Sequence, residues 1–181
     1  MVYVVVAMSG VAQLGDIAYV VCEESSVIRR YEAHTLSPLG EGIHVEGMKD
    51  PTDIVACRHD RQLYVAANWD CIWRVSADDH SYVNWLPTGS PAHAFQFRVY
   101  KMSLTSRGLL VTSSQPPALY EYNTVDAQRL RVVQLPQFVS ELEHGVETSR
   151  GTFVVGHRGT SRDKWQHAVG ELFSAVIYLL Q

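Results

Sequence analysis

The sequence has little net charge, few cysteines and no long apolar run. Its 181 residues include 15 Lys and Arg against 19 Asp and Glu, so the formal net charge is -4. A protein that binds nucleic acid needs a basic surface to neutralise phosphates, so this balance disfavours nucleic acid as a partner. The densest basic cluster comprises His157, Arg158, Arg162 and Lys164, a pattern typical of a solvated loop.

The three cysteines, Cys22, Cys57 and Cys71, are odd in number, which excludes a full disulfide framework. Each stands beside an apolar run, where a thiol acts as a small hydrophobic side chain. This usage favours a reducing compartment, and we predict a cytoplasmic location. No apolar run approaches the roughly 18 residues of a membrane span. The apolar start from Met1 to Met8 lacks the basic residues of a signal peptide, so no membrane partner is expected.

Catalytic signatures are also missing. The sequence contains no nucleophile elbow, phosphate-binding glycine loop, dinucleotide fingerprint or zinc-protease helix motif. Its eight histidines are scattered without the spacing of metal ligands. The residues alone therefore favour a non-catalytic protein without a bound cofactor.

What the sequence does contain is an internal repeat. Four short strand-like runs lie at regular intervals, and we treat Tyr19, Tyr64, Leu110 and Phe153 as their equivalent residues. The steps between these residues are 45, 46 and 43. Steps of this size match the period of about 40–50 residues that one four-stranded propeller blade requires.

Each unit reads as four short strands joined by turns, and no stretch has the apolar spacing of a capped helix. We predict blades at about residues 9–50, 51–97, 98–141 and 142–181, with the later strands of the last unit at 166–169 and 175–180. The predicted fold is all-β, a β-propeller of about four blades of four antiparallel strands. Chance alignment of strands in a β-sandwich or barrel is the alternative.

The segment from Leu63 to Val75 resembles an NHL-type propeller repeat, in which an apolar-Tyr-Val-Ala run is followed by a turn with Asn and then by Ile-x-Val. Ala67 stands where such repeats carry Asp, and the Asn-His-Leu triplet is absent. The resemblance, which extends to SMP-30-like propellers, covers about residues 10 to 171. It implies a six-bladed ring, so we expect four units to form a partial or open propeller or to close a small ring.

Three polar residues near the innermost predicted strands are candidate binding residues, namely Asp53, His144 and Glu147. In a propeller such strand ends surround one mouth of the central channel, where loops from several blades converge on ligands. Local turn chemistry is the alternative for Asp53. The SMP-30-like resemblance also implies a divalent ion in the channel, and Ca²⁺ could take oxygen ligands from Asp16, Asp53, Asn68 and Glu147.

The predicted function is a non-catalytic β-propeller scaffold that binds a protein partner through its blade loops. Aromatic side chains are common anchors at such interfaces, and the candidates are Trp69, Trp73, Trp85 and Trp165. Trp73 is more readily explained by packing between blades. The alternative function is a metal-dependent lactone hydrolase of the SMP-30 or gluconolactonase type, and RNA binding is a third option that the acidic balance disfavours.

Overall fold

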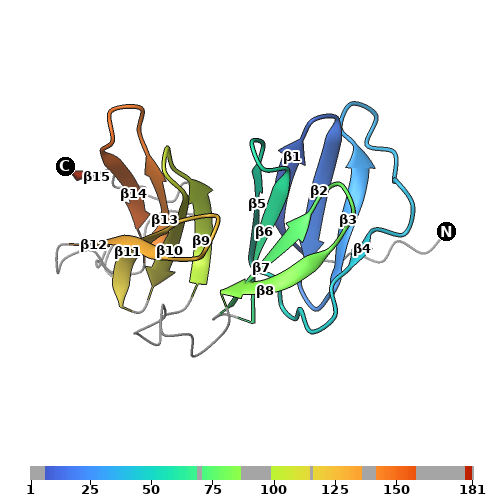
Figure 1. Cartoon of the computed structure of the whole chain (residues 1–181), viewed down its shortest axis with the longest axis horizontal. Helices are drawn as coiled ribbons and strands as arrows, with labels where there is room; N and C mark the ends of the chain where they lie inside the picture. Colours follow the sequence, from blue (N-terminus) through green and yellow to red (C-terminus); the bar gives the residue numbers. More distant parts are fainter. Residues whose placement is uncertain are drawn as a thin grey trace, which may run out of the picture.

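The computed structural model describes residues 7–68, 71–86, 99–114, 116–135, 142–157 and 178–180. Within these residues the chain forms strands and turns and no helix, which confirms the predicted all-β class. The strands make four antiparallel sheets, called blades 1 to 4 here (Figure 1). No helix capable of crossing a membrane occurs in these described ranges.

The blades follow one another along the chain. Blade 1 contains β1 (Met8–Leu14), β2 (Ile17–Cys22), β3 (Val27–Glu32) and β4 (Ile43–His44). Blade 2 contains β5 (Asp53–Cys57), β6 (Gln62–Ala67), β7 (Cys71–Ser76) and β8 (Tyr82–Leu86). Blade 3 contains β9 (Val99–Leu104), β10 (Leu109–Ser114), β11 (Pro117–Tyr122) and β12 (Arg129–Gln134). Blade 4 contains β13 (Leu142–Glu147), β14 (Phe153–His157) and β15 (Tyr178–Leu180).

Within every blade the spatial order of the strands is their order in the chain. A short connection joins β1 to β2, where Leu14 lies opposite Ile17 and two residues form the turn. Gly15 has a φ of 61° in this turn, a left-handed conformation that glycine adopts without steric cost. The polar, glycine-containing turns of the sequence therefore separate the strands where they were predicted to.

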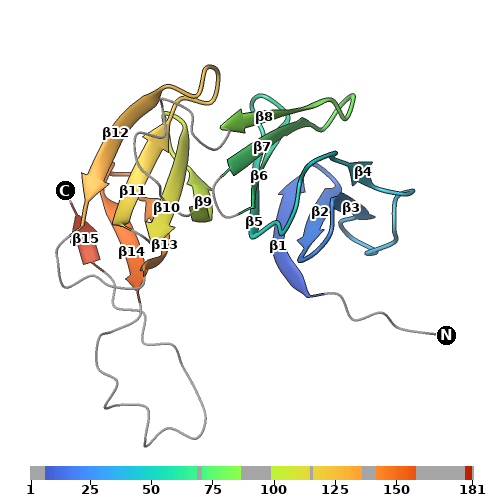
Figure 2. The ribbon, with the colours of Figure 1, turned by 90° about the horizontal axis from the view of Figure 1, so that it is seen from below.

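The innermost strands of neighbouring blades lie against each other, β1 beside β5, β5 beside β9 and β9 beside β13. Figure 2 shows the four sheets following one another around an open arc. The approach of β1 to β5 is so close that a Cβ at Gly10 would lie 2.9 Å from the backbone nitrogen of Ile54. The architecture is a partial β-propeller, as predicted, and the sandwich alternative does not apply.

Three apolar clusters hold the blades together, one at each junction. The first joins blades 1 and 2 through residues such as Tyr19 and Val65, and the second joins blades 2 and 3 around Tyr64 and Tyr120. The third joins blades 3 and 4 around Leu110. Complete burial of one such side chain contributes about 1.5–3 kcal/mol, so stacking of blades is the main stabilising term of the fold.

The equivalence predicted for the four central strands is right in three blades and wrong in the fourth. Tyr19, Tyr64 and Leu110 each pack toward the following blade. Phe153 instead joins the cluster between blades 3 and 4, so it packs toward the preceding blade. Because side chains alternate along a strand, the true counterpart in β14 is the adjacent residue, Val154.

Several other details differ from the sequence predictions. The predicted fourth strand of blade 1 is only two residues long, because a turn with Gly47 at a φ of 85° follows closely. Trp85 is 8% exposed and stacks edge-on against Tyr64 with ring centroids 5.1 Å apart, so it is a core residue rather than a surface anchor. The predicted strand at 166–169, the basic cluster from Arg158 onward, Trp69 and Trp165 lie outside the described residues.

Trp73 packs between blades, as expected. It joins the apolar cluster of blades 1 and 2, and its six-membered ring lies 3.5 Å from where a Cβ on Gly47 would stand. Its ring also contacts Tyr82 edge-on, with centroids 6.0 Å apart. None of the three cysteines forms a disulfide, and Cys22 and Cys71 are buried as small apolar side chains.

Candidate functional site

A lysine on the inner strand of blade 3 lies at the point where the innermost strands converge. The Lys101 ammonium donates to the carbonyl oxygens of Ser9, at 3.2 Å, and Thr52, at 2.9 Å. Its nitrogen also lies 3.5 Å from Oδ1 of Asp53. A single side chain of blade 3 thus connects the inner strands of blades 1 and 2.

Asp53 is the first residue of β5, and its side chain is 13% exposed. Its Oδ2 accepts a hydrogen bond of 2.7 Å from the backbone nitrogen of Met102 on β9. Burial raises the pKa of Asp53, while the Lys101 charge and the Met102 hydrogen bond oppose that rise. The carboxylate therefore joins blades 2 and 3.

His144 on β13 belongs to the same region. Its Nδ1 is buried and has no hydrogen-bond partner among the described residues. Burial lowers the pKa of His144, the Asp53 carboxylate opposes this, and the Lys101 ammonium adds to it. Two of the three candidate binding residues, Asp53 and His144, therefore share one electrostatic environment. We call Asp53, His144 and Lys101 the axial cluster.

Glu147, the third candidate, lies elsewhere. It ends β13, three residues beyond His144 and so about 10 Å further along the strand. Its Oε2 accepts from the backbone nitrogen of Ser106 at 2.8 Å, and its Oε1 accepts from Arg131 at 3.1 Å. These hydrogen bonds and the Arg131 charge hold the pKa of Glu147 below its usual range. The residue connects blades 3 and 4.

The oxygen donors considered for Ca²⁺ do not form one set. Asp53 begins β5, and Asn68 follows the paired end of β6, so these two share one end of blade 2. Asp16 and Glu147 lie at the other end of the blades from Asp53, beside the turn that follows the inner strand in blades 1 and 4. Asn68 is also engaged, since its Oδ1 accepts from the backbone nitrogen of Lys49 at 2.8 Å. No group of three potential metal ligands occurs within the described ranges.

Sequence reasoning missed a buried carboxylate on β11. Glu121 is completely buried, and its Oε2 accepts from Arg131 at 2.6 Å and from Arg107 at 3.1 Å. Its Oε1 accepts from the hydroxyl of Thr105 at 2.5 Å. The guanidinium carbon of Arg131 also lies 4.4 Å from the centroid of the Phe153 ring. The sequence did contain a signal for this buried residue, because Glu121 is a carboxylate within an otherwise apolar and aromatic strand, Leu119-Tyr120-Glu121-Tyr122.

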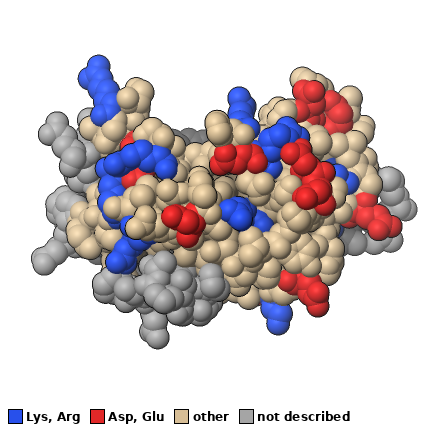
Figure 3. Space-filling view, viewed as in Figure 1, with Lys and Arg blue, Asp and Glu red and all other residues tan. Residues whose placement is uncertain are grey.

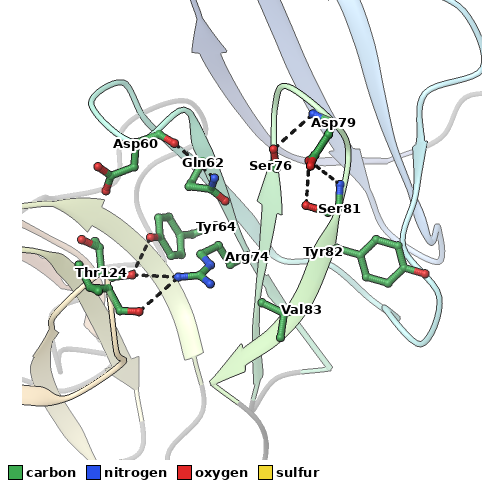
Figure 4. A pocket seen from close by; sticks show the side chains of 11 residues that line it. Asp60, Gln62, Tyr64, Arg74, Ser76, Asp79, Ser81, Tyr82, Val83 and Thr124 are labelled. Atoms are coloured by element: carbon green, nitrogen blue, oxygen red, sulfur yellow. Dashed lines mark hydrogen bonds between the residues drawn. The ribbon is translucent and has the colours of Figure 1, made fainter.

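A groove of about 560 Å³ opens between blades 2 and 3. Its lining crosses β6, β7 and β8 of blade 2 and the β11–β12 turn of blade 3, and Figure 4 shows these side chains around it. Tyr64 donates its hydroxyl to the carbonyl of Thr124 at 3.2 Å. Burial raises the pKa of Tyr64 to about 12, so this hydroxyl keeps its proton.

Arg74 forms one side of this groove. One of its terminal nitrogens donates to the carbonyls of Thr124, at 3.3 Å, and Val125, at 3.4 Å. Arg30 occupies the same place in blade 1, because each pairs with the equivalent tyrosine of the adjacent strand. Its terminal nitrogen lies 2.9 Å from Nε2 of His80 in blade 2. An arginine at this repeat position thus reaches an outer turn of the next blade.

Charges of both signs are mixed on the surface. On the face drawn in Figure 3, Lys and Arg side chains lie among Asp and Glu side chains without a large area of one sign. Mixed charge of this kind does not attract polyanions strongly. Side chains of several strands converge in the groove between blades 2 and 3, in the axial cluster and around Glu121.

Comparison with known proteins supports the fold and not a family. No protein-family model matches the sequence, and no curated protein matches it. The structure is similar to the computationally designed protein Ika4, with a TM-score of 0.65 and 12% identity over 99% of this chain and 94% of that chain. It is also similar to part of the hydrazine synthase of Kuenenia stuttgartiensis, with a TM-score of 0.67 and 15% identity over 91% of this chain and 46% of that chain.

A chain of the mitotic checkpoint complex is similar as well, with a TM-score of 0.62 and 14% identity over 83% of this chain and 44% of that chain. The chain therefore spans most of the designed protein but less than half of these two longer chains. At such low identity the similarities describe the fold alone. The predicted NHL-type or SMP-30-like membership stays a prediction, while the propeller-type architecture is shown.

Proposed function

We propose that this protein is a non-catalytic scaffold that binds a short extended segment of a protein partner in the groove between blades 2 and 3. The observation that carries the proposal is the lining of this groove, where apolar and hydrogen-bonding side chains of two blades face one space. Rigid strands position most of these side chains, so little conformational entropy is lost when a segment binds.

The chemistry of the lining indicates what the segment carries. Val125 is 77% exposed, Val83 45% and Tyr82 40%, which provides apolar surface for an aliphatic or aromatic side chain. Arg74 uses one terminal nitrogen for the blade 3 turn. The guanidinium has five N–H donors in all, and its remaining donors suit a carboxylate. The expected ligand is a peptide with an acidic residue beside an apolar one.

Asp79 lines the same groove, and hydrogen bonds hold its carboxylate in the turn between β7 and β8. Its Oδ1 accepts from the hydroxyl of Ser81 at 2.8 Å and from the backbone nitrogen of Ser81 at 3.0 Å. Hydrogen bonds from the side chain of Ser76 and from Ser81 hold the pKa of Asp79 at about 2. The carboxylate is thus bound to the β7–β8 turn. Asp60 also lines the groove, and Arg74 is the positively charged side chain among the lining residues.

Selection of peptides from a random display library on the purified protein tests this proposal. Peptides that bind are then measured by fluorescence polarisation against Val83→Lys, Val125→Asp and a control, Leu36→Asp, whose position is 68% exposed in blade 1. We expect the two groove variants to weaken binding by about tenfold or more, equal to ~1.4 kcal/mol, and the control to leave it unchanged. Equal affinity for all four proteins would place the binding surface elsewhere and refute the proposal.

The lactone hydrolase alternative rests on the resemblance alone. Its oxygen donors lie at opposite ends of the inner strands, and Asp53 is already bound to Met102 and Lys101. The scaffold proposal instead uses side chains that the fold brings together.

A further inference from the structure

Blade 1 has an apolar face that no described sheet covers. In β2 the side chains of Tyr19 and Val21 pack toward blade 2. Ala18 and Val20 alternate with them and therefore point to the opposite face. On the neighbouring strand β1, Val11 is 57% exposed. This free face of blade 1 is defined here by its apolar residues Val11, Ala18, Val20, Val27 and Tyr31. It also carries Arg29, which pairs with Val20, and Gln13, which pairs with Ala18.

The strand registers show what the free face corresponds to in the other blades. Tyr19 and Tyr64 pair with the equivalent residues Arg30 and Arg74, so Val20 is the counterpart of Val65. By the same registers the counterpart in blade 3 is Val111, and that in blade 4 is Val155. All three counterparts are completely buried against the preceding blade.

The next strand repeats this relation. Tyr31 on β3 is the counterpart of Val75 on β7 and of Tyr122 on β11, and both counterparts are completely buried. The free face of blade 1 therefore carries the residues of a surface that packs on a preceding blade. No preceding blade exists in the described part of the chain.

Blade 4 has the complementary face. Val154 is the counterpart of Tyr19, Tyr64 and Leu110, each of which packs on the following blade. Val154 and Val146, which face each other across β14 and β13, are only partly buried. Blade 4 thus presents the surface that receives a following blade, as blade 1 presents the surface that receives a preceding one.

We propose that a second copy of this chain covers both faces, with blade 4 of each protomer packed on blade 1 of its partner. Two such contacts related by a two-fold axis close a ring of eight blades, because identical head-to-tail contacts close when the rotation returns to its start. Closure removes two exposed apolar faces.

Light scattering coupled to size-exclusion chromatography tests the proposal, which does not depend on the peptide-binding function. The full chain is expected to elute at twice its mass of 20.3 kDa. Val20→Lys and Val154→Glu should each be monomeric, because each would bury an unpaired charge at both contacts. The control Leu36→Lys should stay dimeric.

Mixing the two variants separates a lost contact from a lost fold. A mixed dimer of Val20→Lys and Val154→Glu has one wild-type contact and one in which Lys faces Glu, so the mixture should recover the dimer. A wild-type monomer, dimeric single variants, or a mixture that stays monomeric would overturn the proposal. A broad series of larger oligomers would also overturn it, since it would indicate an open-ended chain instead of a ring.

Discussion

Glu121 offers the sharpest test of how the blades are held together. We consider Glu121→Ala, which removes a completely buried carboxylate and its hydrogen bonds to Thr105, Arg107 and Arg131. The side chain of Arg131 is 30% exposed and retains Glu147 at 3.1 Å, so it loses one of its two carboxylate partners. Breaking a buried ion pair by removing one partner destabilises a protein by about 3–5 kcal/mol.

We therefore expect the free energy of unfolding to fall by about 3 kcal/mol, towards the lower end of that range because Arg131 keeps one carboxylate. Urea denaturation followed by tryptophan fluorescence measures the change, since Trp85 is buried at the junction of blades 2 and 3. Arg61→Ala is the control. It breaks an exposed pair with Asp78, whose side chains are 53% and 60% exposed, and should cost less than about 1 kcal/mol. Equal losses for the two variants would refute the reasoning.

Three further predictions follow from the junctions and the axial cluster. Gly10→Ala should lower the free energy of unfolding by about 1–3 kcal/mol, because the new Cβ would lie 2.9 Å from the backbone nitrogen of Ile54. In the same urea titration the control Gly156→Ala should be nearly neutral, because the atom nearest to its new Cβ would lie 3.9 Å away. The pKa of His144 is lowered in the folded state. Below the usual histidine pKa of about 6.5 the unfolded chain therefore binds one more proton than the folded chain. The free energy of unfolding then decreases as the pH decreases, by up to about 1.4 kcal/mol per pH unit. His144→Gln should remove that part of the loss between about pH 6.5 and 5.5, and the same acid loss in both proteins would contradict it. Arg74→Ala should cost about 1–2 kcal/mol and speed amide exchange in the β11–β12 turn, with unchanged exchange there as the contrary result.

The sequence was sufficient to predict the all-β class, the propeller architecture and most strand positions. This worked because each blade repeats the same physical pattern, apolar strands between polar turns, so the spacing of Tyr19, Tyr64 and Leu110 reports the spacing of sheets. The equivalence failed at Phe153 by one residue. Steps in sequence count loop residues as well as strand residues, and only packing shows which face of the strand a side chain occupies.

The candidate site was harder to predict. Asp53 and His144 do come near each other, since inner strands of neighbouring blades lie side by side. Glu147 does not join them, because three residues along an extended strand reverse the face and cover about 10 Å. The bonds of Lys101 to Ser9 and Thr52 depend on contacts between residues far apart in the chain, and no local pattern indicates them.

Neither the composition nor any motif of the sequence predicted the groove between blades 2 and 3. Arg74 and Arg30 occupy equivalent positions in their blades, and no local pattern of the sequence indicates their contacts with the next blade. The groove itself arises from the β11–β12 turn meeting three strands of blade 2. A repeat alignment therefore locates junctions between blades, while the shape of a junction requires the packed structure.

Each sheet packs side by side on the next through the apolar clusters at the three junctions between blades. Nuclear Overhauser contacts between aromatic rings across a junction test it most directly. Stacked blades should give cross-peaks between the Trp85 ring of blade 2 and the Tyr122 ring of blade 3, whose centroids lie 6.4 Å apart. A folded protein that shows each ring in contact only with residues of its own sheet would contradict the stacking of blades.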